Sequence, residues 1–308
     1  MELDTVAARV KAGHPRERPS RIARTGSLTC VRPGVYLDAE TWAGLSEEAR
    51  HLVRMRAAQH VLGPDTRFSH ESAAVALGIP VIGGLPRRPS VLVPPDGSKS
   101  SSLVRRVHRA ASPGQLQRHD GFVLTSTAQA VLDIAATRSP LAGVVAASHV
   151  RRHLGMPLDV LQDALAESRP YRGARSIEHA LGASTEFSDS PLETLVLVRI
   201  RDLGFAEPVQ QQEIVARGRS YRVDFSWSDG ALVLEADGRV KYEDADLLDE
   251  RTPEQVFWAE KRRADAISEH VARLTRTTWD DAWSGAALEQ QLLTLGVPRI
   301  HPPSALTR

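Results

Sequence analysis

The chain has 308 residues, of which 42% are hydrophobic and 25% are charged, a composition typical of a globular protein with room for two or three domains. No stretch approaches the roughly 18 consecutive apolar residues of a membrane span. The N-terminus carries Glu2 and Asp4 and has no apolar leader segment, which predicts a cytoplasmic protein. The single cysteine, Cys30, excludes an internal disulfide and a CxxC zinc site, and we expect it to be a small buried residue.

The net charge of +1 hides an asymmetry along the chain. Residues 1–189 carry 24 Lys and Arg against 18 Asp and Glu, which gives +6, whereas residues 190–308 carry 15 against 20, which gives −5. The basic part is suited to contact with a phosphate backbone, although a charge of this size would also fit a merely soluble domain. The acidic part is suited to a site lined by carboxylates.

Residues 1–40 resemble a short winged helix. A helix is predicted near residues 4–11, a second helix begins at Pro19, and TCVRPGVYL predicts a strand, a turn at Pro33-Gly34 and a second strand. A recognition helix followed by an arginine-bearing wing is a DNA-binding geometry, whereas an arginine-rich solvated helix on a small cap would give the same pattern. The candidate DNA-binding residues are Arg18, Arg21, Arg24 and Arg32.

Residues 41–187 predict a mixed α/β middle domain. Helices are expected over residues 46–62 and in RFSHESAAVALGIP, STAQAVLDIAATRSP and LAGVVAASHVRRHLG, and short strands in PSVLVPP and GFVLTS. The segment VIGGLPRRP contains glycines, but it lacks the GxxxxGK or GxGxxG spacing of a phosphate-binding loop and no helix follows it. Residues 167–190 predict a linker with one short helix, and the last domain boundary is expected near Ser188.

Residues 188–295 predict a C-terminal α/β domain, followed by a tail over residues 296–308. Ser190 as N-cap, Pro191 at the first helical position and Glu193 three residues after the cap predict the start of a helix. Strands are expected in QQEIVARG, YRVDFSW and ALVLEADG, then a helix through PEQVFWAEKRRADAISEH, then a strand in ARLTRTTW. The predicted fold class is therefore a multidomain α+β protein.

The dipeptide Asp229-Gly230, between two runs of alternating apolar residues, predicts a hairpin with a two-residue type I′ turn. Counting outward from this turn places Asp224 opposite Glu235. The same count places Arg222 opposite Asp237, on the same face of the hairpin. Directly opposed Cβ atoms lie only about 4.5–5.5 Å apart, so the two carboxylates would repel each other. A shared proton, a basic side chain or a divalent cation should offset this repulsion.

The pieces SPLE, YRVDF, LEADGRVKY, EKRRADAI and RLTRTTW, in this order, resemble the very-short-patch-repair-like endonuclease domain of the PD-(D/E)XK nuclease superfamily over roughly residues 188–282. The pieces VRPGVYL, SHESAAVALGIP and VLTSTAQAVLDIA are similar to AbiEi-type antitoxin regulators of type IV toxin–antitoxin systems. The first resemblance implies a restriction-endonuclease-like fold. The second implies a bacterial protein whose N-terminal winged helix binds DNA.

On the nuclease pattern, Asp224 matches the first strand acid and Glu235 the second. In the superfamily this pair binds a divalent ion, usually Mg²⁺, which Mn²⁺ can replace. Glu193 matches the acid of the first helix. The chain departs from the pattern at Asp237, where the superfamily has a lysine that orients or activates the attacking water. The resemblance then leaves Lys261 on the following helix, or otherwise Lys241 just past the strand, to supply that charge.

Each of these side chains also has a structural interpretation. As a capping-box residue, Glu193 needs no further role. Lys261 can form a helical pair with Asp265, four residues later. Asp237 can form a cross-strand pair with Arg222.

Two functions remain open from the sequence. The first is a DNA-binding protein with a Mg²⁺- or Mn²⁺-dependent endonuclease domain that acts on phosphodiester bonds. The alternative is a non-catalytic, antitoxin-like transcriptional regulator that uses the nuclease fold for dimerisation or partner contact. The expected partners are DNA and either a cognate toxin or a second copy of the chain, and no membrane is expected.

Overall fold

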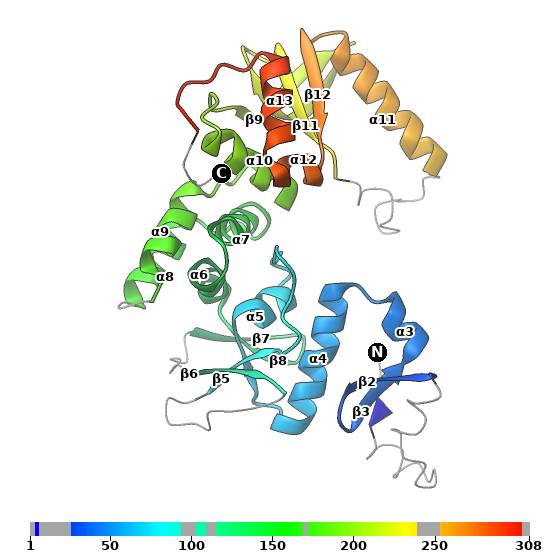
Figure 1. Ribbon diagram of the computed structural model, residues 1–308, viewed down its shortest axis with the longest axis vertical. Helices are drawn as coiled ribbons and strands as arrows, with labels where there is room; N and C mark the ends of the chain where they lie inside the picture. Colours follow the sequence, from blue (N-terminus) through cyan, green and yellow to red (C-terminus); the bar gives the residue numbers. More distant parts are fainter. Residues whose placement is uncertain are drawn as a thin grey trace. The chain divides into compact units, whose positions relative to one another are not determined.

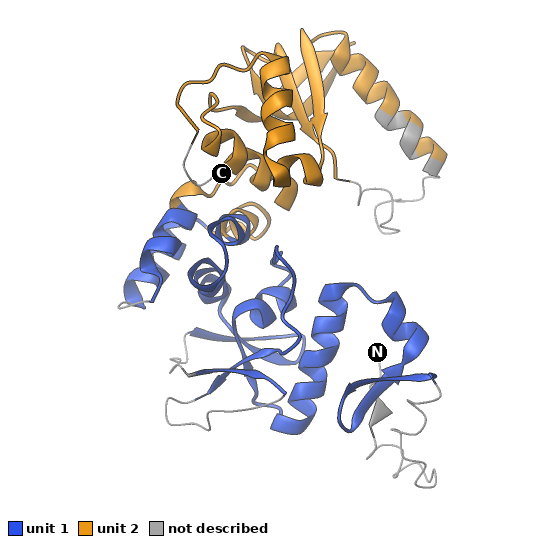
Figure 2. Ribbon diagram, viewed as in Figure 1, with its two compact units in different colours: residues 1–146, 157–181 blue, residues 147–156, 182–308 orange. Residues whose placement is uncertain are grey.

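The computed structural model describes residues 4–5, 26–93, 103–108, 115–168, 172–238 and 253–303. Within these residues the protein is of mixed α/β type, with eleven helices and three sheets (Figure 1). It separates into two compact units, one of residues 1–146 and 157–181 and the other of residues 147–156 and 182–308 (Figure 2). No helix in these ranges is long and apolar enough to cross a membrane. Four predicted site residues lie outside the described residues: Arg18, Arg21, Arg24 and Lys241.

The first sheet of the first unit has three strands in the order β1-β3-β2. The predicted hairpin is formed by β2 (Leu28–Arg32) and β3 (Val35–Asp38), with Gly34 at its tip in the left-handed region, φ +87°. A short strand, β1 (Asp4–Thr5), pairs with the other edge of β3, at the position where the sequence predicted the start of a helix. Cys30 is exposed and not buried as expected, because β2 is an outer strand of this sheet.

The second sheet of the first unit has five strands in the order β6-β5-β4-β8-β7, and both predicted strands, β5 and β8, belong to it. The pairs β4·β8 and β5·β6 are parallel, whereas β4·β5 and β7·β8 are antiparallel. The strands are β4 (Arg67–Phe68), β5 (Ser90–Val93), β6 (Arg105–His108), β7 (Leu116–His119) and β8 (Phe122–Thr125).

The predicted helices of this region form, and serine caps begin two of them. The Ser46 hydroxyl accepts a hydrogen bond from Ala49 N at 3.1 Å at the start of α4, and Ser126 accepts one from Gln129 N at 3.2 Å at the start of α6. Two helices, α3 and α8, were not predicted. The helices are α3 (Ala39–Gly44), α4 (Glu47–Leu62), α5 (His70–Ala76), α6 (Thr127–Thr137), α7 (Pro140–His153), α8 (Leu158–Glu167) and α9 (Ala174–Ala183).

The second unit is built on a four-stranded sheet in the order β12-β11-β10-β9. Its first three strands form an antiparallel meander, and β12 joins β11 in parallel after the crossover helix α11, in the predicted order of elements. Ile267 of α11 packs in one core cluster with Val223 of β10 and Val233 of β11. The elements are α10 (Pro191–Asp202), β9 (Val209–Ala216), β10 (Arg219–Trp227), β11 (Leu232–Ala236), α11 (Pro253–Ser268), β12 (Arg273–Thr277), α12 (Trp279–Ser284) and α13 (Ala286–Leu295).

The hairpin of β10 and β11 has the predicted register. Phe225 pairs with Leu234, and the next step outward along the same register brings Asp224 opposite Glu235. The turn residues Asp229-Gly230 have φ values of +54° and +87°, as a type I′ turn requires. A local turn signal therefore determines which two acids meet at the end of the hairpin.

Candidate functional site

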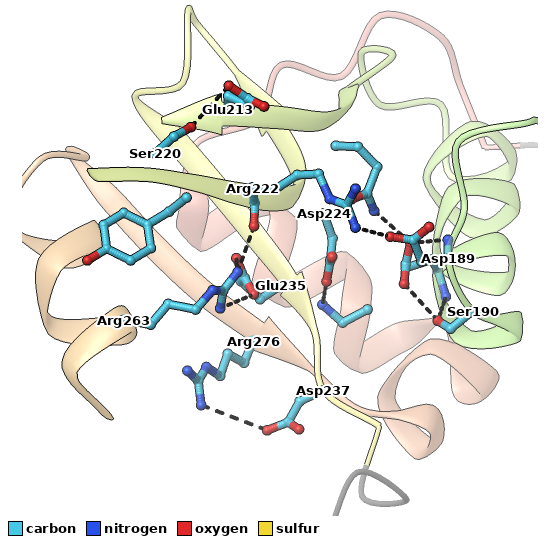
Figure 3. A pocket seen from close by; sticks show the side chains of 14 residues that line it. Asp189, Ser190, Glu213, Ser220, Arg222, Asp224, Glu235, Asp237, Arg263 and Arg276 are labelled. Carbon is cyan, nitrogen blue, oxygen red and sulfur yellow. Dashed lines mark hydrogen bonds and ion pairs between the residues drawn. The ribbon is translucent and has the colours of Figure 1, made fainter. Parts of the chain in front are cut away.

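Four of the predicted acidic residues line one pocket of about 690 Å³ in the second unit (Figure 3). Glu193 comes from α10, Asp224 from β10, Glu235 from β11, and Asp237 from the segment just after β11. The other residues that line the pocket are Asp189, Ser190, Gln211, Glu213, Ser220, Tyr221, Arg222, Ala236, Arg263 and Arg276. The fold thus brings together four carboxylates that are up to 44 positions apart in the chain, from Glu193 to Asp237.

Asp224 lies where the regular strand pairing is interrupted. The pairing of β10 with β9 skips Asp224, and Gln211, the residue opposite it, has a left-handed φ of +54°. On the other side, the Asp224 carboxylate oxygen Oδ2 accepts a hydrogen bond from Ala236 N at 2.8 Å. A left-handed backbone at a residue other than glycine costs roughly 1–3 kcal/mol and is found preferentially at functional sites. The interruption therefore marks this end of the hairpin as a specialised part of the sheet.

The repulsion expected between Asp224 and Glu235 is offset by a basic side chain, Arg263 of α11. Its Nη1 donates to Glu235 Oε2 at 3.0 Å and its Nη2 donates to Glu235 Oε1 at 3.1 Å (Figure 3). Nη2 also donates to the Arg222 carbonyl oxygen at 2.7 Å. The Glu235 residue is only 8% exposed, so this two-pronged ion pair is largely shielded from water.

Sequence reasoning missed Arg263 and selected Lys261 from the same helix. Lys261 is exposed, its Nζ lies 5.2 Å from the centroid of the Trp258 ring, and it is not among the residues that line the pocket. The helical period contained the signal for Arg263, which precedes the buried residues Ala266 and Ile267 by three and four positions. Residues at that spacing share one face of a helix, here the face that packs on the sheet.

Ser190 caps α10 as predicted, but the Glu193 carboxylate accepts from the Ser190 hydroxyl and the Asp189 backbone N, not from the Ser190 backbone N as a full capping box requires, and Glu193 also lines the pocket. Its backbone N donates to Ser190 Oγ at 3.2 Å, and Ser190 Oγ donates to Glu193 Oε1 at 2.9 Å. Its Oε2 accepts hydrogen bonds from Asp189 N at 2.7 Å and from Gln211 Nε2 at 2.8 Å. Burial, followed by the negative charge of Asp224, raises the pKa of Glu193 to about 7. This carboxyl group can therefore exchange a proton near neutral pH.

Arg222 and Asp237 lie opposite each other in the predicted register, but their side chains bind other partners. Arg222 Nη2 lies 2.6 Å from Asp189 Oδ2, and Arg152 Nε lies 2.6 Å from Asp189 Oδ1. Asp237 Oδ2 lies 3.9 Å from Arg276 Nη1 of β12. The reason is that the β10·β11 ladder ends before these positions, and the Asp237 backbone N donates instead to the carbonyl of the last residue of β12 at 2.8 Å.

Arg32, the predicted wing residue, belongs to the first unit and is half-buried. Its Nη1 donates to the Ala57 carbonyl oxygen of α4 at 2.8 Å. Burial lowers the pKa of its guanidinium. Part of this side chain therefore holds the β2–β3 hairpin against α4.

The pocket has the right type of ligand for a hard divalent cation, but its carboxylates already have protein partners. Mg²⁺ is commonly held by one or two carboxylates together with waters. Asp224 and Glu235 supply such a pair, and the Arg263 guanidinium stands in for a cation on Glu235. A group of three or more metal-ligating side chains does not occur in the part of the chain that the structure describes. Cation binding by this pair therefore requires Arg263 to release Glu235.

Chemically, the pocket combines six carboxylates with three arginines. One acid, Glu193, titrates near neutral pH, and another, Glu235, is neutralised by an arginine on a separate helix. Such a site suits the binding of a cation or the handling of a proton beside an anionic substrate. The chain matches no protein-family model and no curated protein.

Proposed function

We propose that this chain is a DNA-binding protein whose second unit is a divalent-cation-dependent endonuclease acting on phosphodiester bonds. The observation that carries the proposal is the convergence of Glu193, Asp224, Glu235 and Asp237 on one pocket. The proposal includes a restriction-endonuclease-like fold for residues 188–295 and a winged-helix-like region over residues 1–40. It is supported by the resemblance of the motifs and by the hairpin register that brings the two strand acids together.

Asp224 and Glu235 would hold Mg²⁺ or Mn²⁺. When bound, such an ion supplies a Lewis acid for the phosphate and lowers the pKa of a coordinated water. Glu193 would take up or release a proton beside Asp224, because its pKa is about 7. Arg263 opposes cation binding, because its two hydrogen bonds occupy both carboxylate oxygens of Glu235. An active state therefore requires the Arg263 guanidinium to move away from Glu235. The position of this side chain would then control whether the site can bind a cation.

The same arginine favours the second candidate, a non-catalytic antitoxin-like regulator. Arg263 neutralises Glu235 without any ion, and Asp237 stands where the nuclease pattern has a lysine. A guanidinium in this position pairs Glu235 without a metal, and removing it would leave that carboxylate buried without its counter-charge. In that case the second unit would serve for contact with a cognate toxin or a second copy of the chain.

DNA cleavage by three proteins separates the candidates: the wild type, Glu235→Gln and Arg263→Gln. The substrates are supercoiled plasmid and nicked, mismatched and single-stranded DNA, each with Mg²⁺ or Mn²⁺. The endonuclease proposal predicts cleavage by the wild type and by Arg263→Gln. It predicts that Glu235→Gln loses more than the roughly 10- to 100-fold that removing an outer-shell partner of a metal ligand costs.

Glu213→Gln is the matched control, because Glu213 is an exposed carboxylate at the same pocket whose Oε2 accepts a hydrogen bond from Ser220 Oγ at 3.0 Å. This variant should cleave as the wild type does. Failure of both the wild type and Arg263→Gln on every substrate would refute the endonuclease proposal. A shift of promoter DNA that is the same for the wild type and Glu235→Gln would then support the regulator.

A further inference from the structure

The first unit contains a groove of about 450 Å³ whose described lining includes four arginines and no carboxylate. Arg32 comes from β2, Arg54 from α4, and Arg87 and Arg88 from the loop that leads into β5. The remaining lining residues are Val31, Pro33, Ala57, Ala58, Pro89 and Leu103. We call this surface the arginine groove. The groove is formed where β2, α4 and the loop before β5, three segments that are distant in the sequence, come together.

At Arg54, the effect of the neighbouring positive charges outweighs that of the negative one. Burial lowers the pKa of the Arg54 guanidinium, and the like charges of Arg87 and Arg50 lower it further. Glu47 acts in the opposite direction with the smallest effect, and its Oε1 already accepts a hydrogen bond from Leu85 N at 2.7 Å. Because like charges that crowd one another raise the energy of the charged state, an anion in the groove would relieve the repulsion.

The loop that carries the adjacent arginine pair is held in place at several points. Pro86 and Pro89 flank the pair and restrict the backbone. The carbonyl oxygen of Pro86 lies 3.2 Å from Nδ1 of the buried His51. Arg138 Nη2 donates to three successive carbonyl oxygens of residues 82–84, at 3.1, 3.0 and 2.6 Å. A loop backbone fixed in this way presents its two exposed guanidinium groups from a defined position, so that only the side chains have to be ordered on binding.

Arg32 closes the groove on the side of the wing. Its hydrogen bond to the Ala57 carbonyl oxygen of α4 fixes the guanidinium across the gap between the hairpin and the helix. Its Nε is buried and has no hydrogen-bond partner within the described ranges. Arg32 therefore serves this surface chiefly as an anchor, and Arg54, Arg87 and Arg88 present the remaining charge.

We propose that the arginine groove binds a backbone phosphate of duplex DNA without reading the base sequence, an inference that rests on the proposed DNA-binding function. The planar guanidinium group donates two parallel hydrogen bonds to phosphate oxygens and is the usual side chain for phosphate recognition. The described lining has no aromatic side chain on which a base could stack, and its hydrogen-bonding side chains are all arginines, so the comparison of two duplex sequences below separates phosphate contact from the reading of guanine edges. These features favour a backbone phosphate over a free nucleotide.

The test is the salt dependence of DNA affinity in the full-length protein. Arg87→Gln/Arg88→Gln removes two exposed charges, and Arg54→Gln is added in a second variant whose folding is checked by thermal unfolding. Fluorescence anisotropy measures binding of two labelled duplexes of equal length and different sequence over a range of salt concentrations. The slope of log K against log salt should fall by about one for each arginine that contacts a phosphate, equally for both duplexes.

The charge-matched control for the larger variant is Arg67→Gln/Arg118→Gln/Arg175→Gln, which removes three exposed arginines that lie outside the groove in the same unit. An equal fall in slope in this control, or an unchanged slope in Arg87→Gln/Arg88→Gln, would overturn the assignment. A third result would also overturn it: Arg87→Gln/Arg88→Gln loses the binding of inorganic pyrophosphate in calorimetry but keeps the wild-type slope of log K against log salt for DNA. The groove would then bind a free phosphate compound.

The outcomes also separate this inference from the proposed function. If the wild type binds neither duplex at low salt, the DNA-binding function fails and the groove assignment fails with it. If the wild type binds both duplexes and the groove variants keep its slope, the groove assignment alone fails.

Discussion

Replacing Glu193 by Gln should remove a pH-dependent loss of stability from the second unit. Burial and the charge of Asp224 raise the pKa of Glu193 from its ordinary value of 4.5 to about 7. A tenfold change in proton affinity is worth about 1.4 kcal/mol, so ionised Glu193 costs the folded state roughly 3 kcal/mol. The glutamine keeps a side-chain oxygen that can accept the hydrogen bond from Ser190 Oγ, and it carries no charge at any pH.

Stability falls with rising pH because the pKa of Glu193 is higher in the folded state than in the unfolded state. Below pH 4.5 the Glu193 carboxyl is protonated in both states, and its contribution to stability is fully present. As the pH rises from 4.5 to about 7, the unfolded state ionises first and this contribution is lost. Above that range both states are ionised and the full cost remains. The wild type should therefore weaken relative to Glu193→Gln across this window.

The assay is urea unfolding at a series of pH values, followed by tryptophan fluorescence. Four of the five tryptophans belong to the second unit, so the signal reports mainly on that unit. The difference in unfolding free energy between Glu193→Gln and the wild type should grow by about 3 kcal/mol between the two ends of the window. Glu254→Gln, an exposed glutamate in the first turn of α11, is the control and should show no such change. A difference for Glu193→Gln that is constant with pH would refute the reasoning.

Two further predictions concern packing and proton linkage. A Cβ at Gly143 would lie 2.8 Å from Ala135 Cα, so Gly143→Ala should destabilise the protein by about 1–3 kcal/mol in thermal unfolding. A Cβ at Gly182 of α9 would meet no atom within 4 Å, so Gly182→Ala should stabilise the protein by up to about 1 kcal/mol. Equal changes in stability for the two variants would contradict the close packing at Gly143. Mn²⁺ binding near neutral pH should release a fraction of a proton, because neutralising the charge of Asp224 lowers the pKa of Glu193. Calorimetry in buffers of different ionisation enthalpy measures this release, and a binding heat that is the same in all buffers would contradict the prediction.

Local rules predicted much of the second unit. The Asp229-Gly230 turn determined the hairpin register, and Ser190 with Pro191 determined the start of α10, because both signals act within a few residues. The order of strands and helices from α10 to β12 followed from periodicity, whereas α12 and α13 were not predicted. The left-handed Gln211 was not predictable in this way, since the alternation of apolar residues contains no sign of an interruption in strand pairing.

The partners of the charged side chains were less accessible from the sequence, because they depend on how separate elements pack. The register placed Arg222 beside Asp237, but the loop before α10 brings Asp189 within 2.6 Å of Arg222. The motif pattern drew attention to Lys261, whereas the buried face of α11 presents Arg263 to Glu235. The arginine groove was missed for the same reason, since its arginines come from three segments that no short motif contains.

Calorimetric titration of Mn²⁺ tests the central claim most directly. The three proteins compared are the wild type, Arg263→Gln and Asp224→Asn/Glu235→Gln, in which the double substitution removes both charges with little change of shape. If the two strand carboxylates form a cation site that Arg263 closes, the wild type binds Mn²⁺, Arg263→Gln binds it more tightly, and the double variant does not bind it. Absence of binding in both the wild type and Arg263→Gln, or equal binding in the double variant, would contradict the account.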